Sequence, residues 1–432
     1  MNKHILTKFL LFFGLYTFFS CEQHHIFFTI SREPPPQNAL IRGSPTNIVV
    51  FNGNMYVASD KLFRYNGTRW SAYWEPPENE RITALAATND YLYILSIADD
   101  AENRRILSSL RRAGSDGHIS HVQASAEGDY ALLQGIFADP SSSRLFASAK
   151  HTNSDLYAIK FLDSNADPAW ITLRENTAKL SGAIYHDDFH YLSTSTRGTA
   201  SSNDTNGGIF RITESEIAAG ENIPVTHLPD SSAIIGGFSR NYNRVFMGMI
   251  KLEDGMIIAV EQEGGTIFQV QRDSFIRLMH NAPHVNTAMA LNINNAGALG
   301  NITATGAIAL WEGEHGDPNN PDNIITSKAL VVGLQERLNI NSHNFGYVEF
   351  ELQANGSLAR NIVRQDPPRI TVHYDSDRYR ATIEKHPIMH LLQTPRSIDP
   401  NMTFFASTQN EGLWSYRNLV DYGGWQWNAE TE

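Results

Sequence analysis

A short two-strand unit recurs seven times along this chain, and this repeat restricts the possible folds more than any other feature. In each copy a turn leads into a short apolar strand that contains Ala, Ser or Gly, followed by a polar loop and a second strand. The copies pair residues 56–59 with 62–65, 93–96 with 106–110, 145–148 with 156–159, 191–194 with 209–212, 257–260 with 267–270, 330–333 with 347–352, and 404–407 with 413–416. No long segment keeps the 3.6-residue apolar period of a helix, so the chain is predicted to be all-β.

Additional strands flank most copies of the unit. A strand rich in small residues precedes the pair at 82–88, 134–138, 181–185 and 306–310, and a bulkier strand follows it at 70–74, 170–173, 275–278, 370–374 and 425–427. Four antiparallel strands per unit, small first and large last, resemble the blades of a β-propeller, because inner strands crowd a central channel while outer strands diverge. The resemblance implies a seven-bladed propeller over residues 44–432. A sandwich or two stacked β domains is the alternative, but neither predicts seven recurrences.

The amino terminus has the pattern of an export signal. Residues 9–19 form an apolar run behind Lys3 and Lys8, which suits a signal peptide and is too short to cross a bilayer of about 30 Å as a helix. Residues 18–21 (FFSC) resemble the lipobox of bacterial lipoproteins, in the looser form tolerated in spirochaetes. Ser20 fits that pattern, whereas Phe18 and Phe19 depart from it. The resemblance implies acyl chains on Cys21, and the alternative is an ordinary signal peptide with an incidental cysteine.

These features divide the chain into a signal peptide (1–20), a lipidated amino terminus and linker (21–43) and the propeller (44–432). The linker contains three consecutive prolines, 34–36, and its apolar stretch 26–30 could instead pair with the domain. The formal charge of −12 becomes −14 once the two signal-peptide lysines are removed, which argues against nucleic-acid binding. A single cysteine excludes intrachain disulfides and cysteine-rich zinc sites. The expected location is the cell envelope, on the periplasmic or cell-surface side of a membrane.

Several short motifs resemble sites but fit turns better. Residues 186–190 (HDDFH) carry two imidazoles and two carboxylates, yet Asp187 and Asp188 align with hairpin turns of other units. Residues 113–117 (AGSDG) join two strands, unlike a nucleophile elbow. Residues 317–323 (DPNNPDN) are rich in oxygen ligands but lack EF-hand spacing, and His24 and His25 are expected to be solvated. Residues 66–70 (NGTRW) resemble an Asp-box turn of sialidase-like propellers without its aspartate, and are interpreted as a β-turn with a Trp anchor.

Alternating strand directions place the loops on two faces of the disc. One face is expected to collect acids (Glu75, Glu78, Glu80, Asp99, Asp100, Glu102) and the polar insert 195–208, and the other to collect the insert 312–323. No catalytic residue, metal ligand or cofactor is predicted, and no ligand-binding residue is selected. The leading hypothesis is a membrane-anchored binding or scaffold lipoprotein for protein or glycan partners. The alternatives are a glycan hydrolase or lyase with its site at the central channel, and a subunit of an envelope assembly machine.

Overall fold

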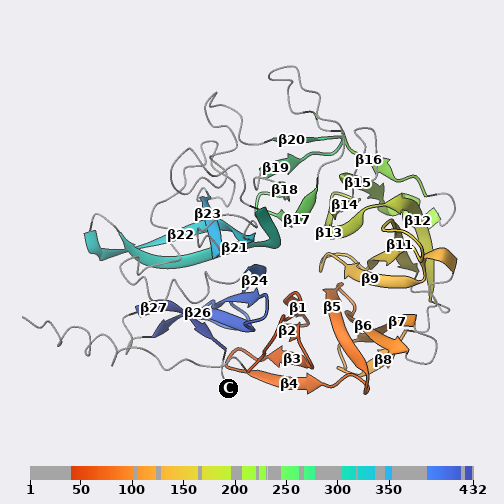
Figure 1. The fold of residues 1–432 in the computed structure, drawn as a ribbon. Helices are drawn as coiled ribbons and strands as arrows, with labels where there is room; N and C mark the ends of the chain where they lie inside the picture. Colours follow the sequence, from red (N-terminus) through yellow and green to blue (C-terminus); the bar gives the residue numbers. More distant parts are fainter. Residues whose placement is uncertain are drawn as a thin grey trace, which may run out of the picture.

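The computed structural model describes residues 40–100, 105–122, 128–163, 168–195, 207–219, 223–229, 231, 245–261, 267–277, 303–317, 320–335, 346–352, 387–419 and 424–430. These residues form six sheets of four strands and one sheet of three, and within each sheet the strands follow their order along the chain. Figure 1 shows the sheets arranged as a ring. The predicted all-β propeller with four-stranded antiparallel blades is therefore confirmed.

Blades 1 to 3 contain β1 (Val49–Phe51), β2 (Asn54–Ala58), β3 (Leu62–Tyr65), β4 (Trp70–Trp74), β5 (Glu80–Ala87), β6 (Leu92–Asp100), β7 (Arg105–Ala113), β8 (Ile119–His121), β9 (Leu132–Phe137), β10 (Phe146–Lys150), β11 (Tyr157–Asp163) and β12 (Ala169–Thr177). Blades 4 and 5 contain β13 (Lys179–His186), β14 (Phe189–Ser195), β15 (Ile209–Thr213), β16 (Thr226–His227), β17 (Phe246–Lys251), β18 (Ile257–Glu261), β19 (Ile267–Val270) and β20 (Phe275–Arg277). Blades 6 and 7 contain β21 (Thr303–Asp317), β22 (Asn320–Gln335), β23 (Gly346–Glu351), β24 (Ile388–Gln393), β25 (Phe404–Thr408), β26 (Leu413–Leu419) and β27 (Gly424–Ala429).

The recurring unit found in the sequence forms the second and third strands of every blade. Its seven copies correspond to the pairs β2–β3, β6–β7, β10–β11, β14–β15, β18–β19, β22–β23 and β25–β26. The flanking strands are also present where the structure describes them, and the predicted strand 70–74 coincides with β4. The predicted outer strand 370–374 of blade 6 lies outside the described residues.

Small residues let the first strands of neighbouring blades approach one another around the ring axis (Figure 1). Gly248 of β17 faces Gly306 of β21, and a Cβ on Gly306 would lie 2.8 Å from the carbonyl oxygen of Met247. A Cβ on Gly248 would lie 3.0 Å from the carbonyl oxygen of Gly306. Because both obstacles are backbone atoms, only glycine fits here without moving a strand. The predicted placement of small residues innermost is confirmed.

Side chains also bond one blade to the backbone of the next. The Asn47 amide next to blade 1 donates to the Leu85 carbonyl at 2.6 Å and accepts from the Leu85 N–H at 3.0 Å. Serine and threonine hydroxyls make single bonds of the same kind. Ser108 and Ser148 accept from the N–H groups of Leu133 and Leu180, and Thr305 and Ser407 donate to the carbonyls of Ile388 and Pro45. These bonds satisfy backbone groups that the sheet ladders leave open and keep adjacent blades in register.

Blade 1 packs directly on blade 7, and a short segment that we call the latch (residues 40–45) joins them. The carbonyl of Ile41 accepts from the Leu413 N–H at 3.0 Å, and that of Gly43 accepts from the Gly412 N–H at 2.8 Å. Ile41 is fully buried in a cluster that also holds Trp70 and Phe405. Folded contacts thus begin ahead of the predicted boundary at residue 44. The alternative closing strand, residues 26–30, lies outside the described residues.

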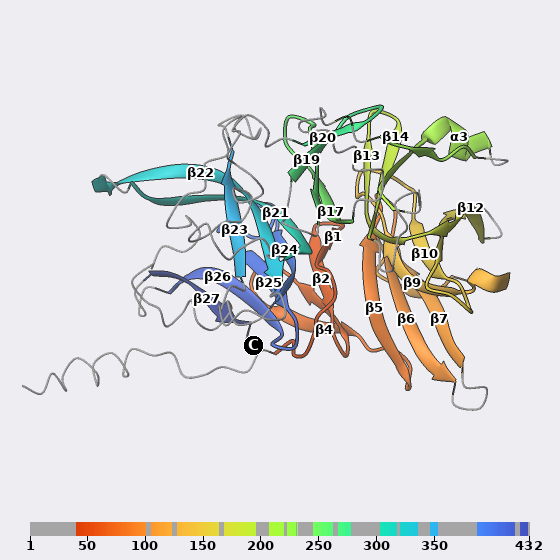
Figure 2. The ribbon, with the colours of Figure 1, turned by 45° about the horizontal axis from the view of Figure 1, so that its top comes forward.

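One expected loop is a hairpin instead. Residues 312–323 were expected to form a polar insert, but β21 continues to Asp317 and β22 begins at Asn320, with Glu312 paired to Lys328. This hairpin extends well outside the ring in Figure 2. The prediction was wrong because it was based on the alternation of apolar and polar side chains. Strand pairing is made by backbone hydrogen bonds, and in β21 it continues past the last apolar residue. Likewise Asp99 and Asp100, expected in a loop, are the last residues of β6.

Among the described residues, two short helical segments interrupt the strands, η1 (Gly128–Tyr130) and α3 (Glu214–Ala219). A capping box starts α3: the Thr213 hydroxyl accepts from the Glu216 N–H at 3.1 Å, and the Glu216 carboxylate accepts from the Thr213 N–H at 2.7 Å. The Thr-x-x-Glu spacing is a sequence signal for a helix start.

Candidate functional site

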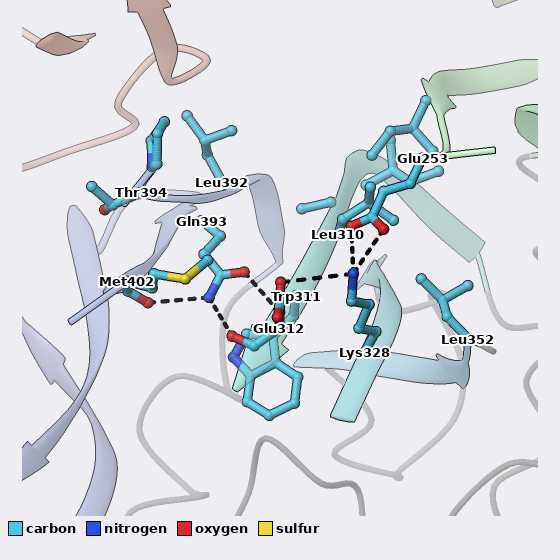
Figure 3. A pocket seen from close by; sticks show the side chains of 14 residues that line it. Glu253, Leu310, Trp311, Glu312, Lys328, Leu352, Leu392, Gln393, Thr394 and Met402 are labelled. Carbon is cyan, nitrogen blue, oxygen red and sulfur yellow. Dashed lines mark hydrogen bonds and ion pairs between the residues drawn. The ribbon is translucent and has the colours of Figure 1, made fainter. Parts of the chain in front are cut away.

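A cavity of about 320 Å³ opens between the first strands of blades 5, 6 and 7. Its wall is mainly apolar with a few polar groups, comprising Ile250, Glu253, Ile308, Ala309, Leu310, Trp311, Glu312, Lys328, Leu352, Leu392, Gln393, Thr394, Pro395 and Met402 (Figure 3). This volume and mixture are typical of small-ligand sites. The turn after β17 and the connection between β24 and β25 contribute to it, which places the cavity on the face that carries first-to-second-strand connections.

The alternation of β21 supplies one side of the cavity. Ala307, Ala309 and Trp311 are buried in the core that blade 6 shares with blade 7. Residues 308, 310 and 312 point to the opposite side and are only half-buried, so Ile308, Leu310 and Glu312 remain available to the cavity, which Ala309 and Trp311 also border. The uniformly apolar stretch 307–311 therefore contributes both to the core shared with blade 7 and to the cavity wall.

Three of the polar side chains in the wall are charged. Lys328 Nζ lies 2.8 and 2.7 Å from the two carboxylate oxygens of Glu253, and 3.9 Å from a carboxylate oxygen of Glu312 (Figure 3). Hydrogen bonding to Glu253 raises the pKa of Lys328, and burial opposes this only in part. The lysine therefore stays protonated at neutral pH, with Glu253 as its main partner.

The Gln393 side chain fixes the backbone around Glu312. Its amide oxygen accepts from the Glu312 N–H at 2.7 Å, and its amide nitrogen donates to the carbonyls of Glu312 at 2.7 Å and Met402 at 3.2 Å. The connection between β24 and β25 is thereby tied to β21. Thr394, fully buried beside it, has a hydroxyl without a hydrogen-bond partner among the described residues.

The charged groups of this wall are two carboxyls and one ammonium. Glu253 and Glu312 are two carboxyls on one cavity wall, and the hydrolase alternative requires a pair of carboxyls at its site. However, the Lys328 ammonium approaches both of them and forms two hydrogen bonds with Glu253. Among the 14 wall residues there is no histidine, cysteine, serine or tyrosine. The described wall thus combines an apolar surface with a bound charge cluster.

A second polar cluster, between blades 3 and 4, has a structural role. His190 Nε2 lies 2.7 Å from Glu214 Oε2, and Arg144 donates to Glu214 Oε1 at 2.8 and 2.5 Å. Burial alone raises the pKa of Glu214, but the hydrogen bonds and charges of His190 and Arg144 outweigh it and lower that pKa to about 2. The His190 side chain is 2% exposed, and the cluster joins Arg144 of blade 3 to His190 and Glu214 of blade 4.

The turn interpretations of residues 186–190, 113–117 and 66–70 are confirmed. Asp187 and Asp188 have φ of 50° and 64° in the β13–β14 turn, and their neighbours Phe189 and His190 join different clusters. The Gly117 N–H donates to the Gly114 carbonyl at 3.0 Å, closing the turn at 113–117. The Asn66 side chain caps the turn before Trp70, which is 3% exposed.

The remaining sequence-selected residues are not brought together. Glu75 pairs with Lys61, while Glu80 accepts two hydrogen bonds from Arg111 on β7. Cys21, His24, His25, Glu102 and residues 196–206 lie outside the described residues, as do 318 and 319 of the oxygen-rich turn. Within the described part of the chain, no group of three or more His, Cys, Asp or Glu side chains is placed to hold a metal ion. No helix in that part is long and apolar enough to span a bilayer.

Comparison with known proteins finds likeness in structure but not in sequence. No protein-family model matches the chain, and no curated protein matches it. An ancestral GH74 enzyme is 14% identical with a TM-score of 0.49, covering 92% of this chain and 47% of that one. Virginiamycin B lyase from Staphylococcus aureus, solved with quinupristin, is 14% identical with a TM-score of 0.48, covering 88% and 97%.

The extracellular domain of a one-component system from B. thetaiotaomicron is 13% identical with a TM-score of 0.46. The match covers 89% of this chain, which spans 40% of the length of that domain. At such identities a likeness extends to the fold at most. The ligands and activities of these proteins are therefore not assigned to this chain.

Sequence reasoning missed most of the cavity. Of its charged residues only Glu312 was singled out, as the start of an insert, while Glu253, Lys328 and Gln393 carried no motif. These residues belong to three different blades between positions 253 and 393, so no local spacing connects them. The one available signal is positional: Glu253 lies in the turn between the first and second strands of its blade, as Asp187 does in blade 4.

Proposed function

We propose that this protein is an exported, lipid-anchored binding protein whose propeller holds a ligand in the cavity between blades 5, 6 and 7. The cavity itself supports this function, because an apolar wall with few polar groups suits burial of a ligand. The charge cluster supports binding over hydrolysis, since Lys328 hydrogen-bonds both oxygens of Glu253 and so engages one of the two carboxyls that a glycan hydrolase would need free. A protein or glycan partner would bind to the face of the propeller that carries the cavity and would place one of its own groups in the cavity.

The binding proposal is tested by observing the cavity directly. In protein labelled with ¹³C-methyl methionine, the Met402 signal, assigned with Met402→Leu, reports occupancy of the cavity. Apolar fragments are expected to shift this signal in the native protein and not in Ile308→Trp, whose added ring fills the space. Ile106→Trp is the matched control, since Ile106 is 49% exposed on blade 2 and the same ring there leaves the cavity open. If no fragment shifts Met402, the proposal is wrong.

The anchor proposal is independent of the cavity and rests on the sequence around Cys21. Acyl chains contribute about 0.8 kcal/mol per buried methylene, so loss of the cysteine should release the protein from membranes. Cys21→Ser is expected to abolish incorporation of radiolabelled palmitate and to move the protein to the soluble fraction. The Ser44→Cys, Cys21→Ser double variant controls for labelling of any available cysteine. Retention of label or of membrane association by Cys21→Ser would contradict the proposal.

A further inference from the structure

The charges on the cavity wall do not balance. Two carboxylates, Glu253 and Glu312, face one ammonium, Lys328. Lys328 is hydrogen-bonded to both oxygens of Glu253, whereas its contact with Glu312 is a 3.9 Å ion pair without a hydrogen bond. Glu253 is thus neutralised at short range, and Glu312 carries most of the excess negative charge into the cavity.

Two polar side chains near the cavity, both among the described residues, direct hydrogen bonds to groups other than the Glu312 carboxylate. The Gln393 amide nitrogen donates its hydrogen bonds to the carbonyls of Glu312 and Met402. The Arg396 guanidinium directs Nε at Met402 Sδ, 2.9 Å away, and is not part of the cavity wall. The Glu312 side chain is 31% exposed, so water can reach and solvate it.

An entering ligand would remove that water, and this sets its chemistry. A purely apolar ligand would leave the Glu312 carboxylate buried without a partner, which is costly for a charged group. A carboxylate ligand would add repulsion. A fully polar cation would gain nothing from Ile250, Ile308, Leu310, Leu352 and Leu392, the apolar part of the wall.

We propose that the cavity binds an amphipathic amine, with its ammonium paired to Glu312 and its apolar body against the strands of blades 5 to 7. This inference rests on the proposed function of the cavity and specifies the ligand class for it. Glu312 acts as the selectivity residue, and Lys328 keeps Glu253 from competing for the ligand's charge.

Three probes of nearly equal size test the proposal: hexylamine, hexanol and hexanoate. Their dissociation constants are measured at pH 7 in 150 mM salt from the Met402 methyl shift. We expect hexylamine to bind at least about tenfold more tightly than hexanol, which corresponds to one charge-assisted contact, and hexanoate most weakly. In Glu312→Gln the affinity for hexylamine should fall to that for hexanol. Glu75→Gln, which removes the same charge from an exposed pair outside the cavity, should leave all three affinities unchanged.

The outcomes separate this inference from the function on which it rests. Hexanol or hexanoate binding as tightly as hexylamine overturns the amine selectivity and leaves the cavity as a ligand site. Hexylamine binding that survives Glu312→Gln also overturns it. If none of the probes shifts Met402, the amine inference is wrong, and the fragment screen then decides whether the cavity binds anything. Thermal unfolding of each variant confirms that the fold is retained.

Discussion

Gly306→Val is expected to lower the free energy of unfolding by about 3 kcal/mol, because it inserts a branched side chain where two backbones meet. A Cβ at this position would lie 2.8 Å from the Met247 carbonyl oxygen. That oxygen belongs to β17, so relief requires the first strands of blades 5 and 6 to separate. Equilibrium unfolding in urea measures the effect as a shift of the transition midpoint.

Gly114→Val is the matched control for this substitution. A Cβ on Gly114 would meet its nearest atom, the Asp116 side chain, at 3.4 Å, which is ordinary contact with a movable group. We expect a change of about 0.5 kcal/mol or less there. Equal midpoints for Gly306→Val and the native protein would show that β17 and β21 can move apart at no cost, contrary to the close approach of their backbones.

Ile41→Ala is expected to destabilise the protein by about 3 kcal/mol, since it empties a fully buried position at the seam of the ring. Ile41 packs in the cluster that joins Trp70 of blade 1 to Phe405 of blade 7. Loss of the side chain removes apolar contacts from both blades at once. The loss is measured by urea unfolding of protein that contains the latch.

The adjacent residue provides the control. Leu40 is 36% exposed, and Leu40→Ala is expected to change the free energy of unfolding by only about 0.5 kcal/mol. A small effect at Ile41 and a large effect at Leu40 would show that Leu40, and not Ile41, is the buried side chain. Equally small effects at both positions would show that direct packing of blades 1 and 7 closes the ring without the latch.

The sequence was sufficient for the blades because each blade repeats the same local pattern. The alternation of apolar and polar residues predicts where the strands lie. The small residues of β17 and β21 predict that these two strands are innermost in their blades, as the contact of Gly248 with Gly306 shows. Where a segment lacks alternation, prediction fails. Residues 312–317 read as a loop but extend β21 through backbone pairing. Ile41 ends a short apolar run, 39–41, without alternation, and its burial depends on a blade some 370 positions away.

The cavity could not be predicted for a related reason. Its apolar residues look like ordinary strand residues, and its polar groups become neighbours only when three blades are in place. Lys328 lies 75 residues from Glu253, and Gln393 lies 81 residues from Glu312. The repeat gives every blade the same framework, so the sequence does not show at which pair of blades the first strands leave a space.

The latch meets the ring on the side opposite the cavity. It bonds to Gly412 and Leu413, at the connection between the second and third strands of blade 7, whereas the cavity is built from first-to-second-strand connections. If the chain is tethered at Cys21, tension from the membrane enters at the latch and acts first on its backbone hydrogen bonds to blade 7. The seam between blades 1 and 7 is then the mechanical weak point of the protein, and of the three blades that form the cavity only blade 7 receives the pull directly.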